Sequence, residues 1–166
     1  MTDADHRAAC PRTLRIAALP LLLLALGCSR APSTPAASAA GSEESRMPAT
    51  MSVGDTEVLA SVVPTLALND AIAAQYGIDR ARDRVLVLVS LRAGDDARQG
   101  HVGATARDLR GVRQSIAFRE VRTGDLVDYV GIARVTPPDT LRLDIDVVLA
   151  DGRRTTLRFS RDIARP

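Results

Sequence analysis

The chain has 166 residues, enough for one domain and little more. Aromatic residues make up only 2% of it and tryptophan is absent, so its core must be built from Val, Leu, Ile and Ala. Charged residues make up 25%, and the formal net charge of +2 argues against the strongly basic surface of a nucleic-acid-binding protein.

The first element in chain order is an apolar segment over residues 16–26, preceded by Arg7, Arg12 and Arg15. Its 11 residues fit the h-region of a secretory signal, whereas a transmembrane helix needs about 20. The segment runs into Leu24-Ala25-Leu26-Gly27-Cys28, which resembles the lipobox of bacterial lipoproteins. The resemblance implies that residues 1–27 are a signal peptide, cleaved between Gly27 and Cys28, and that Cys28 is acylated. An ordinary cleaved signal, or a buried helix with a chance cysteine, is the alternative.

Ser29 rather than Asp follows Cys28. By resemblance to bacterial lipoproteins, this favours an anchor in the outer membrane, facing the periplasm. The only other cysteine, Cys10, lies in the removed segment, so no disulfide or cysteine metal site is expected in the mature domain. Residues 28–50 comprise the anchored cysteine and a segment rich in Ala, Ser and Pro. This segment has too little apolar surface to offset its ordering entropy, which predicts a disordered linker.

Residues 51–166 have the pattern of one β domain. A short helix is expected at about 68–77, with Asn69 as its N-cap and Gly77 just beyond its C-terminus. No crossover helices are available for parallel strands, so we predict an antiparallel, immunoglobulin-like β-sandwich. Seven segments have strand composition: 56–63, 83–91, 100–109, 114–121, 126–135, 139–149 and 154–163.

The last two segments form a hairpin whose register can be predicted from the apolar alternation. A two-residue turn would place apolar residues opposite charged ones. A three-residue loop over 151–153 instead pairs Ile145 with Phe159 and Val147 with Leu157. That register also places Asp146 opposite Arg158 and Arg142 opposite Asp162.

No residue pattern in the chain indicates a catalytic or metal centre. Asp144 and Asp146 lie two apart on one strand face, where a solvated surface with arginine neighbours is the simpler interpretation. Asp95 and Asp96 fall in a loop without the ligand spacing of an EF-hand. His101 is the only histidine after the signal, and no nucleophile or orienting acid is implied by spacing. A set of arginines could form a stripe for anionic headgroups, but the interleaved acidic residues favour a salt-bridged surface: Arg107, Arg110, Arg113, Arg119 and Arg122.

Three stretches together resemble the bacterial family called domain of unknown function 4426. They are AAQYGIDRARDRVLVLVSL (73–91), ATARDL with IAFREVRTGDLVDYVGIARV (104–135), and DTLRLDIDVVLADGRRTTLRFSRDI (139–163). Val130 and Ala104 depart mildly from the family pattern. The resemblance implies a small exported β-sandwich and no activity. The motif residues, which we interpret as structural, are Tyr76, Gly77, Arg107, Arg119, Glu120, Gly124, Asp125, Tyr129, Asp144 and Asp146.

These observations predict a lipid-anchored envelope protein that acts as a non-enzymatic binding or adaptor module. Its expected partners are the membrane, through Cys28, and an envelope protein, with no nucleic acid and no cofactor. One alternative is an envelope hydrolase or metal-dependent enzyme that uses His101 with acidic loop residues. Another is a purely structural role in maintaining the envelope. The candidate binding loops are 92–100, 110–113, 122–125 and 150–153.

Overall fold

A computed structural model describes residues 47–165 of the chain. The expectations for Gly27, Cys28 and most of the linker lie outside these residues. The described part contains nine strands, a 3-10 helix at Thr65–Ala67 and the short helix α2 at Asp70–Gln75. The strands are β1 (Ala49–Val53), β2 (Thr56–Pro64), β3 (Arg84–Ala93), β4 (Asp96–Ala97), β5 (Gly100–Arg107), β6 (Arg113–Thr123), β7 (Leu126–Arg134), β8 (Asp139–Leu149) and β9 (Arg154–Ile163).

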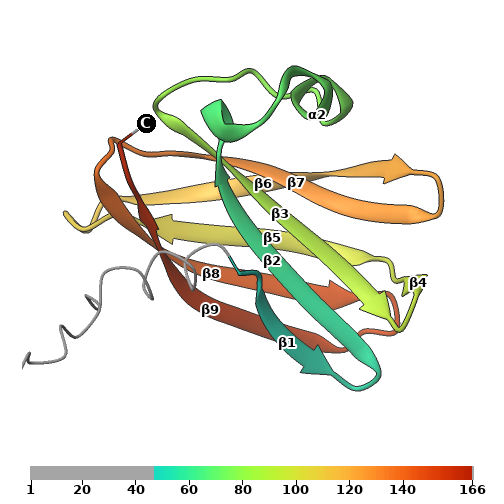
Figure 1. Cartoon of the computed structure of the whole chain (residues 1–166). Helices are drawn as coiled ribbons and strands as arrows, with labels where there is room; N and C mark the ends of the chain where they lie inside the picture. The colour runs from blue at the N-terminus through green and yellow to red at the C-terminus, as the bar shows by residue number, and fades with distance from the viewer. Residues whose placement is uncertain (1–46, 166) are drawn as a thin grey trace, which may run out of the picture. The chain divides into compact units, whose positions relative to one another are not determined.

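All strand pairs are antiparallel, in the order β1-β2-β3-β7-β6-β5-β8-β9, with β4 paired to β3 (Figure 1). Strand β6 connects the two halves of this order. Its first half pairs with β5 over 113–117, and its second half pairs with β7 over 118–123. Where the backbone pairing between β6 and β7 ends, the side-chain amide of Gln114 continues the contact between the two strands. It donates to the Arg134 carbonyl at 2.7 Å and accepts from the Arg134 N–H at 2.8 Å.

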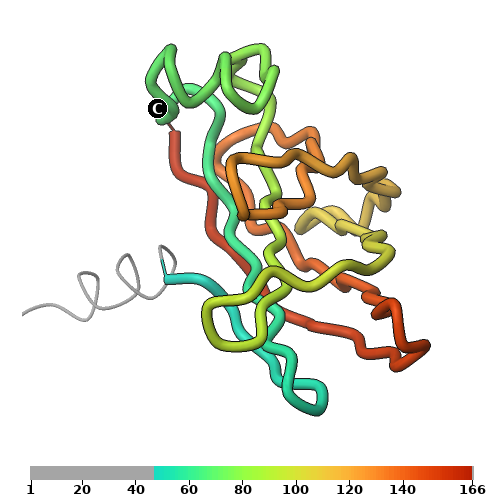
Figure 2. Tube along the Cα trace, turned by 90° about the vertical axis from the view of Figure 1, so that its right-hand side faces the viewer, coloured from blue at the N-terminus to red at the C-terminus, as the bar shows by residue number. Residues whose placement is uncertain are grey.

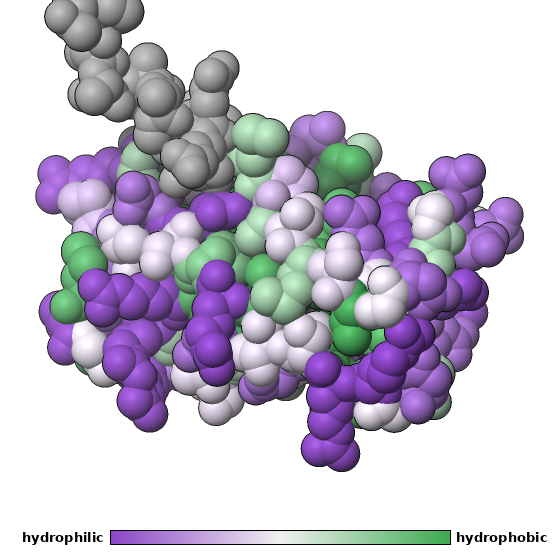
Figure 3. All heavy atoms as spheres, turned by 90° about the horizontal axis from the view of Figure 1, so that it is seen from below, coloured by the Kyte–Doolittle hydropathy of each residue, from purple (hydrophilic) through white to green (hydrophobic). Residues whose placement is uncertain are grey.

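The sheet is nearly closed into a barrel, which corrects the expectation of a seven-stranded sandwich. All seven expected strands are present, and two further strands, β1 and β4, were not expected. The two sheets of the expected sandwich are joined into one by β6. At the remaining seam, β1 approaches β9, and the Thr155 hydroxyl lies 2.9 Å from the Met51 sulfur. Seen from below, this side of the molecule has hydrophilic side chains around its rim and a more apolar band along its middle (Figure 3).

The core lies inside the barrel and is aliphatic, as the composition requires. Alternate residues of β3 and β8 point inward and are almost fully buried, which gives each strand one core face. The largest fully buried side chains are Leu91, Leu141, Leu143, Ile145, Val58, Val85, Val87, Val89, Val147 and Thr65.

Helix α2 covers a second, smaller core on the outer face of β3 and β7, built on Leu68, Ala73, Leu86 and Val130. The helix begins where predicted, because the Asn69 side chain accepts a hydrogen bond from the Ile72 N–H at 2.8 Å. It ends before Gly77, whose φ of +56° is the left-handed conformation that a helix C-terminus favours. Within residues 47–165, no helix is long and apolar enough to cross a membrane.

The β8–β9 hairpin corrects the predicted register by two residues. Ile145 pairs with Leu157 and Val147 with Thr155, around a loop closed by the Leu149–Arg153 backbone hydrogen bond at 2.8 Å. A two-residue shift keeps every side chain on its expected face, so apolar alternation alone cannot distinguish the two registers. The ionic partners change as well: Asp144 faces Arg158, Asp146 faces Thr156, and Arg142 faces Ser160.

Candidate functional site

Three of the four candidate loops meet at one end of the barrel (Figure 2). Segment 92–100 contacts the β8–β9 turn, where the Ala150 N–H donates to the Gln99 carbonyl at 3.1 Å. The β6–β7 turn lies on the other side of this segment. The fourth loop, 110–113, is at the opposite end, because β5 carries the chain across the whole sheet before it.

A hollow of about 700 Å³ opens between segment 95–99 and the β6–β7 turn. The end of segment 95–99 is held by Tyr129, a buried residue of β7 whose hydroxyl accepts a hydrogen bond from the Gly100 N–H at 2.9 Å. The Arg98 N–H donates to the Leu91 carbonyl at 2.7 Å, which holds the segment against β3. The lining residues are Asp95, Asp96, Ala97, Arg98, Gln99, Arg122, Gly124, Asp125 and Val127.

An ion-pair cluster fixes the loops beside the hollow. Arg153 donates to Asp151 at 2.7 Å and to Asp55 at 2.9 Å, and Arg98 lies 3.6 Å from Asp55. The hydrogen bonds from Arg153 lower the pKa of both Asp55 and Asp151, and in turn they raise the pKa of Arg153. The turns β1–β2 and β8–β9 are therefore tied to the wall of the hollow that carries Arg98.

The hollow presents charges of both signs. Arg98 is partly neutralised by Asp55, and Arg122 pairs with Glu120 at 2.6 Å. No residue in 47–165 forms a hydrogen bond or ion pair with the carboxylates of Asp95, Asp96 or Asp125. A polar partner that enters the hollow would therefore meet unpaired carboxylates on both walls.

The geometry that an enzyme built on His101 requires is not present in the described part of the chain. His101 is exposed, no carboxylate of residues 47–165 lies within hydrogen-bond distance of it, and it does not line the hollow. Those residues also contain no group of three or more His, Cys, Asp or Glu side chains that could hold a metal ion.

Residues 50–163 match the family described as Domain of unknown function (DUF4426). The chain belongs to the DUF4426 family. A crystal structure of a DUF4426 protein from Pseudomonas aeruginosa PAO1 superposes with a TM-score of 0.64 at 20% identity, covering 72% of this chain and 96% of that one. A copper-bound variant of FetP from uropathogenic Escherichia coli strain F11 has a TM-score of 0.48 at 10% identity, covering 72% and 93%. No curated protein matches the chain.

Two motif residues of this DUF4426 domain hold helix α2 on the sheet. The Tyr76 hydroxyl donates to the Asp128 carboxylate at 2.9 Å, and the Arg119 guanidinium donates to the Tyr76 carbonyl. Ser90 also donates to Asp128, at 2.5 Å. Sequence reasoning missed Asp128 and Ser90. Asp128 did carry a signal, because it is a carboxylate in the apolar run 126–133, where a buried charge needs partners.

The remaining motif residues of the DUF4426 domain lie apart from one another. Gly124 and Asp125 form the β6–β7 turn at the hollow, and Gly124 has a φ of +60°. Asp144 pairs with Arg158 at 3.3 Å, and Asp146 accepts from the Thr156 hydroxyl at 2.6 Å, both on the outer face of β8. Arg107 lies at the far end of β5. The structure therefore places only Gly124, Asp125, Glu120 and Tyr129 at or beside the hollow.

Proposed function

We propose that this DUF4426 protein is a non-enzymatic binding module, lipid-anchored through Cys28 to the bacterial outer membrane on its periplasmic side. We further propose that it binds a polar segment of an envelope protein in the hollow. The observation that carries the proposal is the hollow itself. It is formed by two inter-strand segments at one end of the barrel. Three of the carboxylates that line it have no partner among the described residues, those of Asp95, Asp96 and Asp125.

The anchor is supported by the sequence at residues 24–28, which resembles a lipobox. Residues 29–46 separate Cys28 from the first described residue, Met47. Fully extended, this stretch would reach about 60 Å. A domain on such a tether can meet a partner in the same membrane without leaving its anchor.

The binding site is tested by photo-crosslinking in the envelope. A photoreactive phenylalanine analogue is placed in the full-length chain at Gln99 or at Asp125, both on the hollow. The control position is Ala71, which is exposed on helix α2. We expect one defined protein adduct from both hollow positions and none from Ala71. The same adduct from all three positions, or from none, would contradict a partner in the hollow.

The anchor is tested separately by metabolic labelling with a fatty acid. We expect the label in the full-length protein and its complete loss in the Cys28→Ala variant, with the protein in the outer-membrane fraction. A labelled protein that gives no adduct would leave the anchor standing and refute the binding site.

A further inference from the structure

The end of the domain opposite the hollow carries a row of three arginines. Arg107 of β5 is directly opposite Arg113 of β6 on one side and Arg142 of β8 on the other. Arg113 and Arg142 are exposed and Arg107 is partly buried. Like charges directly opposite one another on neighbouring strands are unfavourable unless an anion lies between them.

None of the residues 47–165 supplies that anion to Arg107, Arg113 or Arg142. Two carboxylates on the same face already have partners. Asp144 pairs with Arg158, and Asp162 accepts from the Thr140 hydroxyl at 2.6 Å. The five arginines that the sequence suggested as one stripe therefore fall into two groups in the structure, those with a partner in this chain and those without. Arg110, Arg119 and Arg122 contact groups of this chain, while Arg107 and Arg113 do not and are joined by Arg142.

Two apolar side chains project beside this row. Leu109 and Val112, in the loop between β5 and β6, are 62% and 59% exposed. Only Met47 is more exposed among the large hydrophobic residues of the described chain, at 66%. Exposed apolar side chains next to unpaired arginines are typical of surfaces that rest on a membrane interface.

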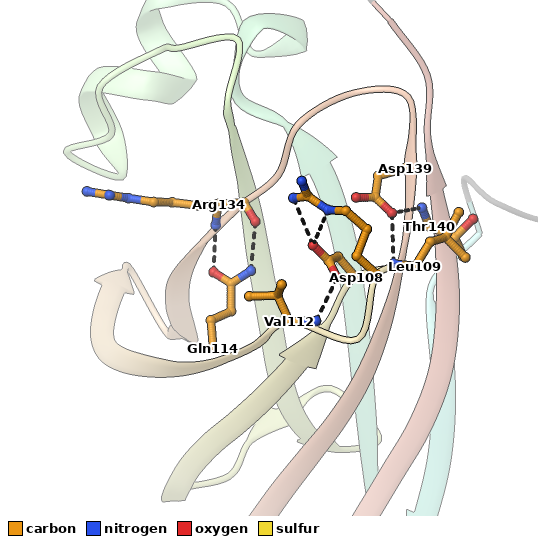
Figure 4. Close-up of polar contacts among 8 residues, drawn as sticks. Asp108, Leu109, Val112, Gln114, Arg134, Asp139 and Thr140 are labelled. Atoms are coloured by element: carbon orange, nitrogen blue, oxygen red, sulfur yellow. Dashed lines mark hydrogen bonds and ion pairs between the residues drawn. The ribbon is translucent and has the colours of Figure 1, made fainter.

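The loop holds these side chains outward through a fixed backbone (Figure 4). The Asp108 carboxylate accepts from the Val112 N–H at 2.8 Å and from the Arg110 guanidinium at 3.1 Å. The Asp139 carboxylate accepts from the Leu109 N–H at 3.0 Å. Burial would raise the pKa of Asp108, but the hydrogen bonds from Val112 and Arg110 outweigh it and lower this pKa. The carboxylate is therefore ionised at neutral pH and keeps the loop closed.

The chain enters the described domain from the same side. The Met47 carbonyl accepts from Arg161, near the end of β9, at 2.6 Å, and β9 follows β8 and β5 in the sheet. Arg161 pairs with Leu141 of β8, the neighbour of Arg142. Figure 1 shows the β5–β6 loop at the left of the view and β1 running away from it, toward the lower right. A linker from a membrane anchor would therefore reach the domain at the end that carries the arginine row.

We propose that this end, formed by Arg107, Leu109, Val112, Arg113 and Arg142, docks on the anionic phospholipid surface of the membrane that holds Cys28. This inference rests on the proposed function for the anchor. The three guanidiniums would neutralise lipid phosphates while Leu109 and Val112 enter the interface. None of these five residues is aromatic, which suits headgroups better than nucleic acid, whose bases stack on aromatic side chains.

Docking would determine which way the hollow faces. Strands β5 and β8, of 8 and 11 residues, connect the two ends, and at about 3.3 Å per residue they span roughly 30 Å. The hollow would then point away from the bilayer and be accessible to a periplasmic partner.

Because the chain contains no tryptophan, a single introduced one reports its own surroundings. We would purify the full-length protein in its envelope-processed form, carrying either Val112→Trp or, as the control at the hollow, Asp125→Trp. Each is mixed with vesicles of phosphatidylcholine alone or of phosphatidylcholine with phosphatidylglycerol. We expect a blue shift, and quenching by brominated lipid, only for Val112→Trp and only with phosphatidylglycerol.

The charge requirement is tested with two double variants of equal net charge. In the Val112→Trp protein, Arg113→Gln with Arg142→Gln should weaken the phosphatidylglycerol-dependent signal by about fivefold per arginine removed. Arg92→Gln with Arg154→Gln, away from this end, should leave it unchanged. If both double variants weaken the signal equally, the signal depends only on net charge, and the proposed docking surface is wrong.

Sedimentation with vesicles of phosphatidylcholine alone measures membrane binding through the lipid anchor, independently of the docking surface. A protein that sediments but shows no Val112→Trp shift with phosphatidylglycerol refutes docking and leaves the anchor standing. A protein that fails to sediment refutes the anchor, and docking is then decided by the Val112→Trp signal with phosphatidylglycerol vesicles.

Discussion

At the scale of single residues, Asp128 is the side chain that links β7 to β3 and to the end of helix α2 on the outer face of the sheet. It is 7% exposed and accepts hydrogen bonds from Tyr76 and Ser90. Asp128→Ala would leave both hydroxyls without an acceptor in a largely buried site. We expect a loss of about 2–3 kcal/mol in the free energy of unfolding, measured by urea titration.

The matched control is Asp125→Ala, three positions earlier in the same hairpin. Asp125 is exposed, and no described residue forms a hydrogen bond or ion pair with its carboxylate. Its removal should change the free energy of unfolding by less than about 0.5 kcal/mol. Equal effects of the two substitutions would show that the buried hydrogen bonds contribute nothing.

Tyr76 gives the same site a dependence on alkaline pH. Burial, then the hydrogen bond to Asp128 and its charge, raises the pKa of the Tyr76 hydroxyl above its ordinary value of 10.0. The stabilisation is complete below the pKa of the unfolded chain and is lost as pH rises through the folded value. Tyr76→Phe should therefore unfold with less alkaline dependence than the parent protein, measured by urea midpoints at neutral and alkaline pH.

Tyr76→Phe also allows the pKa of Tyr76 to be measured from tyrosinate absorbance. The chain has only two tyrosines and no tryptophan, so subtracting the tyrosinate titration of Tyr76→Phe isolates Tyr76. An ordinary pKa in that difference curve would contradict the buried contact with Asp128.

At the scale of elements, Gly131 marks where β6 passes close to β7. A Cβ at this position would lie 2.5 Å from Cγ2 of Ile116 and 3.0 Å from Cε1 of Phe118. Gly131→Ala must therefore displace core side chains, and we expect a loss of about 1–3 kcal/mol in the free energy of unfolding. Thermal and urea denaturation would both measure it.

Gly103→Ala in β5 is the matched strand control, since a Cβ there has no heavy atom within 4 Å. It should be neutral or slightly stabilising. If Gly131→Ala proves no more costly than Gly103→Ala, then β6 and β7 do not approach each other as described.

The elements also show what could be read from the sequence. The seven expected strands and the start of α2 were predictable, because alternation and the Asn69 cap are local signals. Strand β1 was missed although ATMSV alternates apolar and polar residues, because this five-residue segment directly follows a long stretch of small and polar residues. The passage of β6 between two partners depends on contacts distant in sequence, so the barrel-like closure and the meeting of loops at the hollow could not be predicted.

The docking residues show the same division. Arg107 and Arg113 were visible as basic residues, but Arg142 belongs to another stretch of sequence and joins them only through the register of β5 and β8. Their lack of partners was not predictable either, because the sequence places acidic residues nearby that prove to be engaged elsewhere.

At the scale of the whole molecule, the two ends share a sensitivity to acid. The pKa values of Asp55 and Asp151 at the hollow, and of Asp108 at the opposite end, are lowered. Groups with lowered pKa values stabilise the fold above their unfolded pKa, near 3.8 here, and this contribution is lost as pH falls through the folded values. The urea midpoint should therefore decrease as pH is lowered below about 4.

Arg153 allows the hollow end to be separated from the rest of this acid response. Its guanidinium binds both Asp55 and Asp151, so Arg153→Gln should return both pKa values toward normal and flatten the acid slope. The control is Arg154→Gln, which removes the same charge from the next residue. Arg154 is exposed and forms no ion pair with a described residue, so this variant should keep the parental dependence of the urea midpoint on acid pH. Identical slopes in the two variants would mean that the acid loss arises from general charge repulsion. The ion-pair cluster would then not be what ties the three loops around the hollow.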